Sequence, residues 1–123
     1  MTWLAVAIGG ALGAMSRYGL SLWLAPSGNG FPWSTWVVNV LGSALIGLCF
    51  VMIVERGIIA EYWRPLFMVG FLGALTTFSA FTIEALVLWQ QGQTQTSIVY
   101  IISSVAACLI AAASTLWLAQ KIF

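Results

Sequence analysis

The residues whose types could do chemistry gather in the segment GFLGALTTFSAF, residues 70–81. The segment carries no charge, but it places two glycines and the hydroxyls of Thr76, Thr77 and Ser79 inside an apolar run. Glycine weakens a helix by up to about 1 kcal/mol relative to alanine, and hydroxyl side chains offer the backbone competing partners. We therefore expect a helix to break here. The carbonyls that end its first half can hold a cation, and the free N–H groups that start its second half favour an anion.

Two aromatic rings follow the hydroxyls. Phe78 and Phe81 are three residues apart and share one helix face. An aromatic ring has a negative face and a positive edge, so edges turned into a pore would give a weakly positive lining without ionised groups. Such a lining suits an anion that must bind and then leave. The alternative is that both rings are ordinary packing or lipid-facing residues.

Further polar side chains lie inside other apolar segments. Asn39 stands in VVNVLGSALIG, and a stripe recurs at helical spacing near the C-terminus. The residues of that stripe are Ser97, Tyr100, Ser104, Cys108 and Thr115. Taken singly, such residues are interhelical hydrogen-bonding groups in membranes. Their combination with the expected break favours a functional role.

The composition decides where these groups must work. The chain has 123 residues, of which 62% are hydrophobic and 6% charged, whereas a soluble domain carries roughly 25% charged residues. It is therefore an all-α integral membrane protein. Histidine is absent, which removes the usual general base, and Cys49 and Cys108 lie in apolar runs, typical of small buried residues. The net charge of +1 does not indicate a nucleic-acid partner.

Four segments are long and apolar enough to span a bilayer, which takes about 20 residues each. They run approximately over residues 2–24, 33–54, 65–89 and 97–122, in one transmembrane domain. The connectors APSGNGFP, ERGIIAEYWR and QQGQTQT are short. The N-terminal run lacks the basic start of a secretory signal and is too long for a cleaved one.

The positive charges are distributed unevenly between the two sides of these spans. Arg56, Arg64 and Lys121 share one side with both termini, and Arg17 at most lies on the other. Three against one favours a cytoplasmic location for the first side. A bias this thin also fits a protein that inserts in both orientations.

Small residues mark the expected helix contacts. Gly9 and Gly13 form a small-xxx-small pair, and residues 42–47 and 103–114 are rich in glycine, alanine and serine. In lipid such faces let helix backbones approach closely. So many small faces indicate a homo-oligomer, most simply a dimer, with a compact monomeric bundle as the alternative.

The chain resembles the Fluc (CrcB) fluoride channels along nearly its whole length. The matching pieces are GGALGAMSRY, STWVVNVLGSALIG, GFLGALTTFSAF with Glu84 after it, and the Tyr-x-x-x-Ser stripe of the last span. Ala80, Ala74 and Cys108 depart from the common pattern, where Thr, Gly and Ser are frequent. The resemblance implies an antiparallel, dual-topology homodimer with two fluoride pores in the bacterial cytoplasmic (inner) membrane.

The resemblance also implies roles for single residues. A structural sodium ion at the dimer interface would be bound by the backbone carbonyls of Gly73 and Thr76 from each subunit. Arg17 is expected at an aqueous pore mouth, with interfacial anchoring as the alternative. Glu84 is not expected to be a ligand, because an acid repels an anion; it would support packing or tune the mouth. The fluoride pore would be lined by Asn39, Phe78, Ser79, Phe81, Tyr100 and Ser104.

The resemblance therefore predicts passive fluoride export that protects the cell from fluoride toxicity. A small proton-coupled multidrug exporter is the alternative, but its mechanism needs an interior acid, typically in the first span, and Glu84 is the one intramembrane candidate. A non-transporting assembly subunit would not need a broken helix. An enzyme is not expected, since the chain has neither histidine nor paired carboxylates.

Overall fold

The computed structural model describes residues 1–24 and 30–123, and every regular element in that part is helical. This confirms the expected all-α class. The connector APSGNGFP falls mostly on residues 25–29, outside the described residues. The elements are α1 (Thr2–Trp23), α2 (Trp33–Cys49), the π-helical η1 (Phe50–Glu55), the 3-10 turn η2 (Glu61–Trp63), the π-helical η3 (Pro65–Leu72), α3 (Gly73–Leu75), α4 (Phe78–Gln90) and α5 (Thr94–Ile122).

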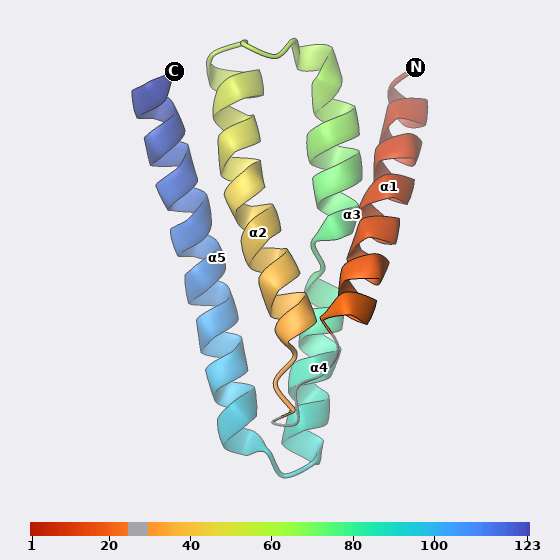
Figure 1. Ribbon diagram of the computed structural model, residues 1–123, viewed down its shortest axis with the longest axis vertical. Helices are drawn as coiled ribbons and strands as arrows, with labels where there is room; N and C mark the ends of the chain where they lie inside the picture. Colours follow the sequence, from red (N-terminus) through yellow and green to blue (C-terminus); the bar gives the residue numbers. More distant parts are fainter. Residues whose placement is uncertain (25–29) are drawn as a thin grey trace.

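The elements join into rods that stand side by side in Figure 1. α2 continues through η1 to Glu55, and η3 continues through α3 to Leu75. The bounds differ from the expected spans by one residue except at α5, which begins at Thr94 instead of Ser97. The reason is the tight turn at Gly92, where φ is +77°. This turn takes only residues 91–93, so the polar residues that follow form the first turn of α5.

Three of these rods are long and apolar enough to cross a membrane. They are Trp33–Glu55, Glu61–Gln90 and Thr94–Ile122, the second including the break. α1 has 22 residues and lies along η3 and α3; its crossing, and so the number of four spans, stays a prediction. In chain order the rods are α1, α2 with η1, the broken third rod formed by η3, α3 and α4, and α5. Both termini and the connection between η1 and η3 lie at one end of the molecule (Figure 1).

Glycines set the contact between α1 and η3. A Cβ added to Gly9 would meet the Leu66 carbonyl, and one added to Gly13 would meet the Phe71 carbonyl. From the other side, a Cβ on Gly70 would come 2.8 Å from the Val6 carbonyl. The two helices therefore touch backbone to backbone, as expected for small faces in lipid.

A second close contact joins α2 to α5. A Cβ on Gly47 would lie 2.6 Å from the Ala112 carbonyl. Beside it the Thr115 hydroxyl donates to the Ala44 carbonyl at 2.8 Å. This end of the polar stripe is therefore interhelical hydrogen bonding, as is Ser97, whose hydroxyl donates to the Ala85 carbonyl at 2.8 Å.

Two clusters of buried apolar residues lie in the described part of the chain, one on each side of the break. The first joins Val38 of α2 to Leu72 and Leu75 of the third rod. The second lies between α4 and α5 and contains Phe31, Phe81, Ala85, Leu88 and Tyr100. Each half of the broken rod thus packs in its own buried cluster.

The glycine contact gives a first prediction. Gly13→Ala should lower the free energy of unfolding by about 1–3 kcal/mol, because the added methyl meets a backbone carbonyl that cannot move aside alone. Thermal unfolding in detergent would measure it. Gly10→Ala is the matched control on the same helix, since its Cβ meets nothing within 4 Å. Equal stability of the two variants would contradict the close packing.

Candidate functional site

The third rod breaks where the sequence predicted. α3 ends at Leu75, and Thr76 (φ −80°, ψ 151°) and Thr77 (φ −149°, ψ 124°) are extended before α4 begins at Phe78. The Thr77 hydroxyl then caps α4 by accepting from the Ala80 N–H at 3.2 Å. Threonine stabilises such a helix start because its side-chain oxygen replaces a missing backbone acceptor.

Asn39 of α2 holds the break with both ends of its amide. Its Nδ2 donates to the Thr77 carbonyl at 3.0 Å, and its Oδ1 accepts from the Thr77 N–H at 2.8 Å. In a continuous helix the Thr77 N–H would donate to the Gly73 carbonyl. The sequence analysis assigns Asn39 to a pore, and the structure shows that the same amide holds the break. Its second Nδ2 hydrogen has no acceptor among the described residues.

Thr76 is held from two sides. Its hydroxyl donates to the Leu72 carbonyl at 2.9 Å, so the first half-helix keeps a bonded last turn. A Cβ on Gly42 of α2 would collide with the Thr76 methyl group. Gly42 follows Asn39 by three residues and therefore lies on the same helix face. The sequence analysis assigns Gly42 to a face of small packing residues, and the structure shows that it also makes room for Thr76 at the break.

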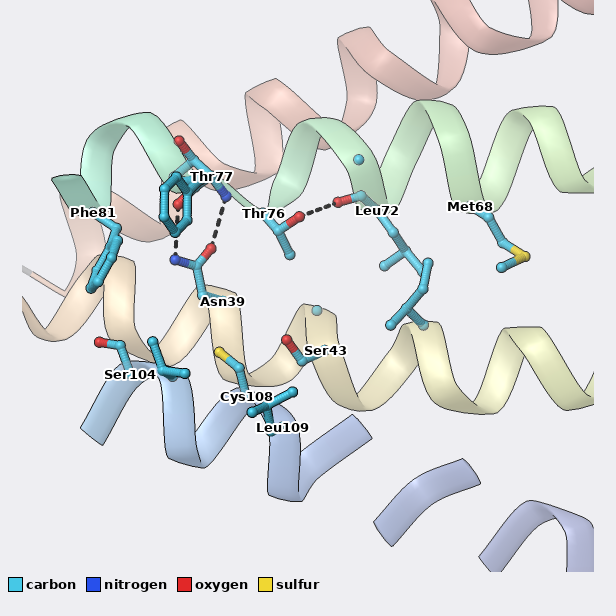
Figure 2. Close-up of a pocket in the computed structure, with 15 residues that line it drawn as sticks. Asn39, Ser43, Met68, Leu72, Thr76, Thr77, Phe81, Ser104, Cys108 and Leu109 are labelled. Atoms are coloured by element: carbon cyan, nitrogen blue, oxygen red, sulfur yellow. Dashed lines mark hydrogen bonds between the residues drawn. The ribbon is translucent and has the colours of Figure 1, made fainter. Parts of the chain in front are cut away.

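A groove of about 560 Å³ opens beside the break, between α2, α5 and the third rod. Figure 2 shows Asn39, Thr76 and Thr77 on one side of it and Ser104 and Cys108 of α5 on the other. The residues that line it are Asn39, Gly42, Ser43, Ile46, Met68, Leu72, Gly73, Thr76, Thr77, Phe78, Phe81, Ser104, Val105, Cys108 and Leu109.

Ser104 presents an unpaired hydroxyl to this groove. The residue is only 5% exposed, and its Oγ has no hydrogen-bond partner among the described residues. An unsatisfied buried polar group costs roughly 1–3 kcal/mol. A ligand in the groove that accepts or donates a hydrogen bond would remove that cost. Cys108, one turn further along α5, adds a thiol to the lining.

The two rings meet as their spacing predicted. The centroids of Phe78 and Phe81 are 5.3 Å apart with an interplanar angle of 46°. Their environments differ: Phe81 is 8% exposed, and Phe78 is 77% exposed. Phe81 also packs on the Tyr100 ring at 5.3 Å, so Phe81 is fixed from behind while the Phe78 ring has an open face.

Tyr100 lies behind the groove and does not line it. It is fully buried, and its hydroxyl donates to Glu84 Oε2 at 2.7 Å. The Thr35 hydroxyl donates to Glu84 Oε1, also at 2.7 Å. Glu84 thus accepts from α2 and α5 at once and joins three rods. Its carboxylate also lines a smaller groove of about 270 Å³ beside residues 30–32. Nothing in the sequence pattern singles out Thr35, because its bond to Glu84 depends on how α2 and α4 are placed relative to each other.

Ser79 and Arg17 also lie outside the residues that line the groove. Ser79 is exposed, with its hydroxyl 3.2 Å from that of Thr77. Arg17 is half-buried, and its Nε donates to the Ala74 carbonyl at 3.3 Å. The structure therefore brings four of the six expected pore residues to one groove: Asn39, Phe78, Phe81 and Ser104.

Comparison with known proteins gives the family. A family model described as "CrcB-like protein, Camphor Resistance (CrcB)" matches residues 4–116. The chain belongs to the CrcB family. It is 48% identical over 120 residues to the "Fluoride-specific ion channel FluC" of Saccharophagus degradans, covering 98% of this chain and 90% of that protein. The same name is carried by a Hahella chejuensis protein that is 48% identical over 118 residues, covering 95% of this chain and 93% of that protein.

As a CrcB-family member with three long apolar helices, the chain is a multi-pass bacterial membrane protein. The family match covers most of α1, all of α2, the break and most of α5. All residues of the groove therefore fall inside the CrcB match.

Removing the Asn39 amide tests the break. Asn39→Ala leaves both the N–H and the carbonyl of Thr77 without a partner, and should lower the free energy of unfolding by about 2–4 kcal/mol. Thermal unfolding measures the loss. Ser43→Ala is the control, because it removes a polar group from the same groove one turn away. If the two variants unfold alike, Asn39 does not hold the break.

Proposed function

We infer that this CrcB-family chain is a fluoride-specific ion channel. The observation that carries the inference is the close relationship to proteins named fluoride-specific channels, over nearly the full length of both chains. The protein is accordingly not an enzyme, and the exporter alternative is not retained. Transport is passive, located in the bacterial cytoplasmic membrane, and protects the cell by letting fluoride leave.

The groove offers the groups that a fluoride path needs. Fluoride is small and strongly hydrated, so a pore has to replace water with donors. The free Nδ2 hydrogen of Asn39 and the unpaired Ser104 hydroxyl supply two such donors across the groove. The positive edges of Phe78 and Phe81 would supply weaker contacts further along. Narrow spacing of these groups would exclude larger halides.

The two remaining pore residues would act differently from expectation. Tyr100 would support the path by holding the Phe81 ring from behind, since its hydroxyl is taken by Glu84. The Ser79 hydroxyl would join the pore lining only in the dimer, because its side chain is exposed beside Phe78 on the side where the second copy is proposed to pack.

A second copy of the chain would complete the path. The groove is open along one side, and the Phe78 ring at its edge is 77% exposed. This open side lies beside the groups proposed to bind the ion. A wall is needed there to keep lipid away from the polar groups of the groove. We propose that this wall is the equivalent surface of an antiparallel partner, which gives a dual-topology homodimer with two pores.

The break also fits the proposed sodium ion. The Gly73 carbonyl loses its usual donor to Asn39, and Gly73 is exposed. Thr76 follows in an extended conformation that turns its carbonyl out of the helix. Unwound carbonyls at a half-helix end are ligands for Na⁺ in membrane proteins. Gly73 and Thr76 from both subunits would hold the ion, which would supply positive charge and join two broken helices.

Ion flux tests the channel. In liposomes with a potassium ionophore, the protein should release fluoride but not chloride. Phe81→Ile should slow fluoride release by about tenfold or more, a change of about 1.4 kcal/mol in the barrier, because it removes the ring edge from the lining. Phe67→Ile is the control, since Phe67 packs on Trp63 away from the groove. A folded protein that moves neither halide would rule out the channel.

Sodium dependence tests the ion and the dimer. Replacing sodium by N-methylglucamine should lower the unfolding temperature by several degrees, since a ligand at 100 times its Kd adds about 2.7 kcal/mol of stability. Light scattering in detergent should give a particle of two chains in sodium. The sodium assignment would be abandoned if the unfolding temperature were the same in both cations.

A further inference from the structure

Arg17 carries a charge that the proposed pore does not use. It is half-buried on α1, and its Nε donates to the Ala74 carbonyl at 3.3 Å. No ion pair with a carboxylate is formed by Arg17 within the described residues. A charged group inside a membrane segment is costly and pairs with another charge or with backbone carbonyls. Here its partner is a carbonyl next to the break.

The glycine stripe of α1 brings Arg17 to this place. Gly9, Gly13 and Arg17 follow one another at intervals of four and therefore lie along one face. The two glycines meet the backbone of the third rod at Leu66 and Phe71. The same face, one turn later, sets the guanidinium beside α3. The backbone contact thus fixes the register that Arg17 needs.

The Ala74 carbonyl needs a donor because of the break. In a continuous helix it would accept from the Phe78 N–H, but Phe78 begins α4 beyond two extended residues. The last carbonyls of a helix carry partial negative charge, which a cation stabilises. The Arg17 guanidinium donates to the Ala74 carbonyl from α1. The Asn39 Oδ1 accepts from the Thr77 N–H from α2.

We propose that Arg17 is a positioning residue, a tethered cation that holds the carbonyl end of the first half-helix and so fixes the break. Asn39 and Arg17 then hold the break from α2 and α1 respectively. One consequence rests on the proposed function: because Ala74 lies between Gly73 and Thr76, the guanidinium weakens the attraction of their carbonyls for sodium. Arg17→Gln would therefore increase the affinity for sodium.

Amide hydrogen exchange at the break tests the proposed role of Arg17. In sodium-free buffer, Arg17→Gln should speed amide exchange across residues 72–80 about fivefold to thirtyfold, the effect of losing a cation at a helix end. Exchange in the second half of α5 should stay near wild type, which a general loss of stability would not allow. Arg17→Lys keeps the charge without the planar donors and should give a smaller increase.

Arg56→Gln is the matched control. Arg56 also donates to a carbonyl, that of Gln120 at 3.1 Å, but at the far end of α5 and exposed to solvent. It should leave exchange across residues 72–80 unchanged. If Arg17→Gln fails to fold, Arg17→Lys is compared with Arg56→Lys in the same way. The proposal is overturned if the Arg17 variants exchange like the Arg56 variants, or if exchange rises equally everywhere.

A sodium titration of the unfolding temperature separates the two proposals. With Arg17→Gln, half of the stabilisation by sodium should occur at a concentration at least about fivefold lower than in wild type. If neither protein responds to sodium while local exchange still rises, the sodium part of the proposed function fails and Arg17 remains the cation of the break. If both respond with the same midpoint, the claimed effect of Arg17 on sodium is wrong.

Discussion

The two hydrogen bonds between Asn39 and the backbone of Thr77 are the interaction on which the site depends. A helix that breaks in an apolar environment leaves N–H and carbonyl groups that water cannot satisfy, and each is costly. One amide side chain satisfies both groups of one residue. Because Asn39 is on α2, the break is also tied to the rod that packs on α5 through Gly47 and Thr115. The groove between α2, α5 and the break is therefore fixed in width.

Several polar side chains near the groove have hydrogen-bond partners, whereas the Ser104 hydroxyl has none among the described residues. Glu84 accepts from Thr35 and Tyr100, and the Trp36 indole donates to Ser103 at 3.2 Å. Against this background the buried Ser104 hydroxyl has no partner in the described residues. Ser104 therefore differs from these neighbours, and the proposed ion in the groove would supply the missing partner.

Local features could be read from the sequence, and relations between rods could not. The break followed from glycines and hydroxyls within one short segment, and the Phe78–Phe81 contact from a spacing of three. The partners of Tyr100 and Arg17 depend on the depth and rotation of two helices relative to each other. A helical stripe gives neither, so Tyr100 and Ser104 were placed together although one binds Glu84 and the other faces the groove. Asn39 was found, but its role in holding the break needed the structure.

The arrangement of charge suits the anion path proposed for the groove. Arg17 bonds to a carbonyl beside the break and Glu84 lies on α4, and neither is among the residues that line the large groove. Each is bound by uncharged groups: a carbonyl for Arg17, and the hydroxyls of Thr35 and Tyr100 for Glu84. The groove is left with dipoles, hydroxyls and ring edges. A guanidinium that donated directly to the anion would hold it too tightly, and a bare carboxylate would repel it. Keeping both charges behind the lining allows an anion to bind and to leave.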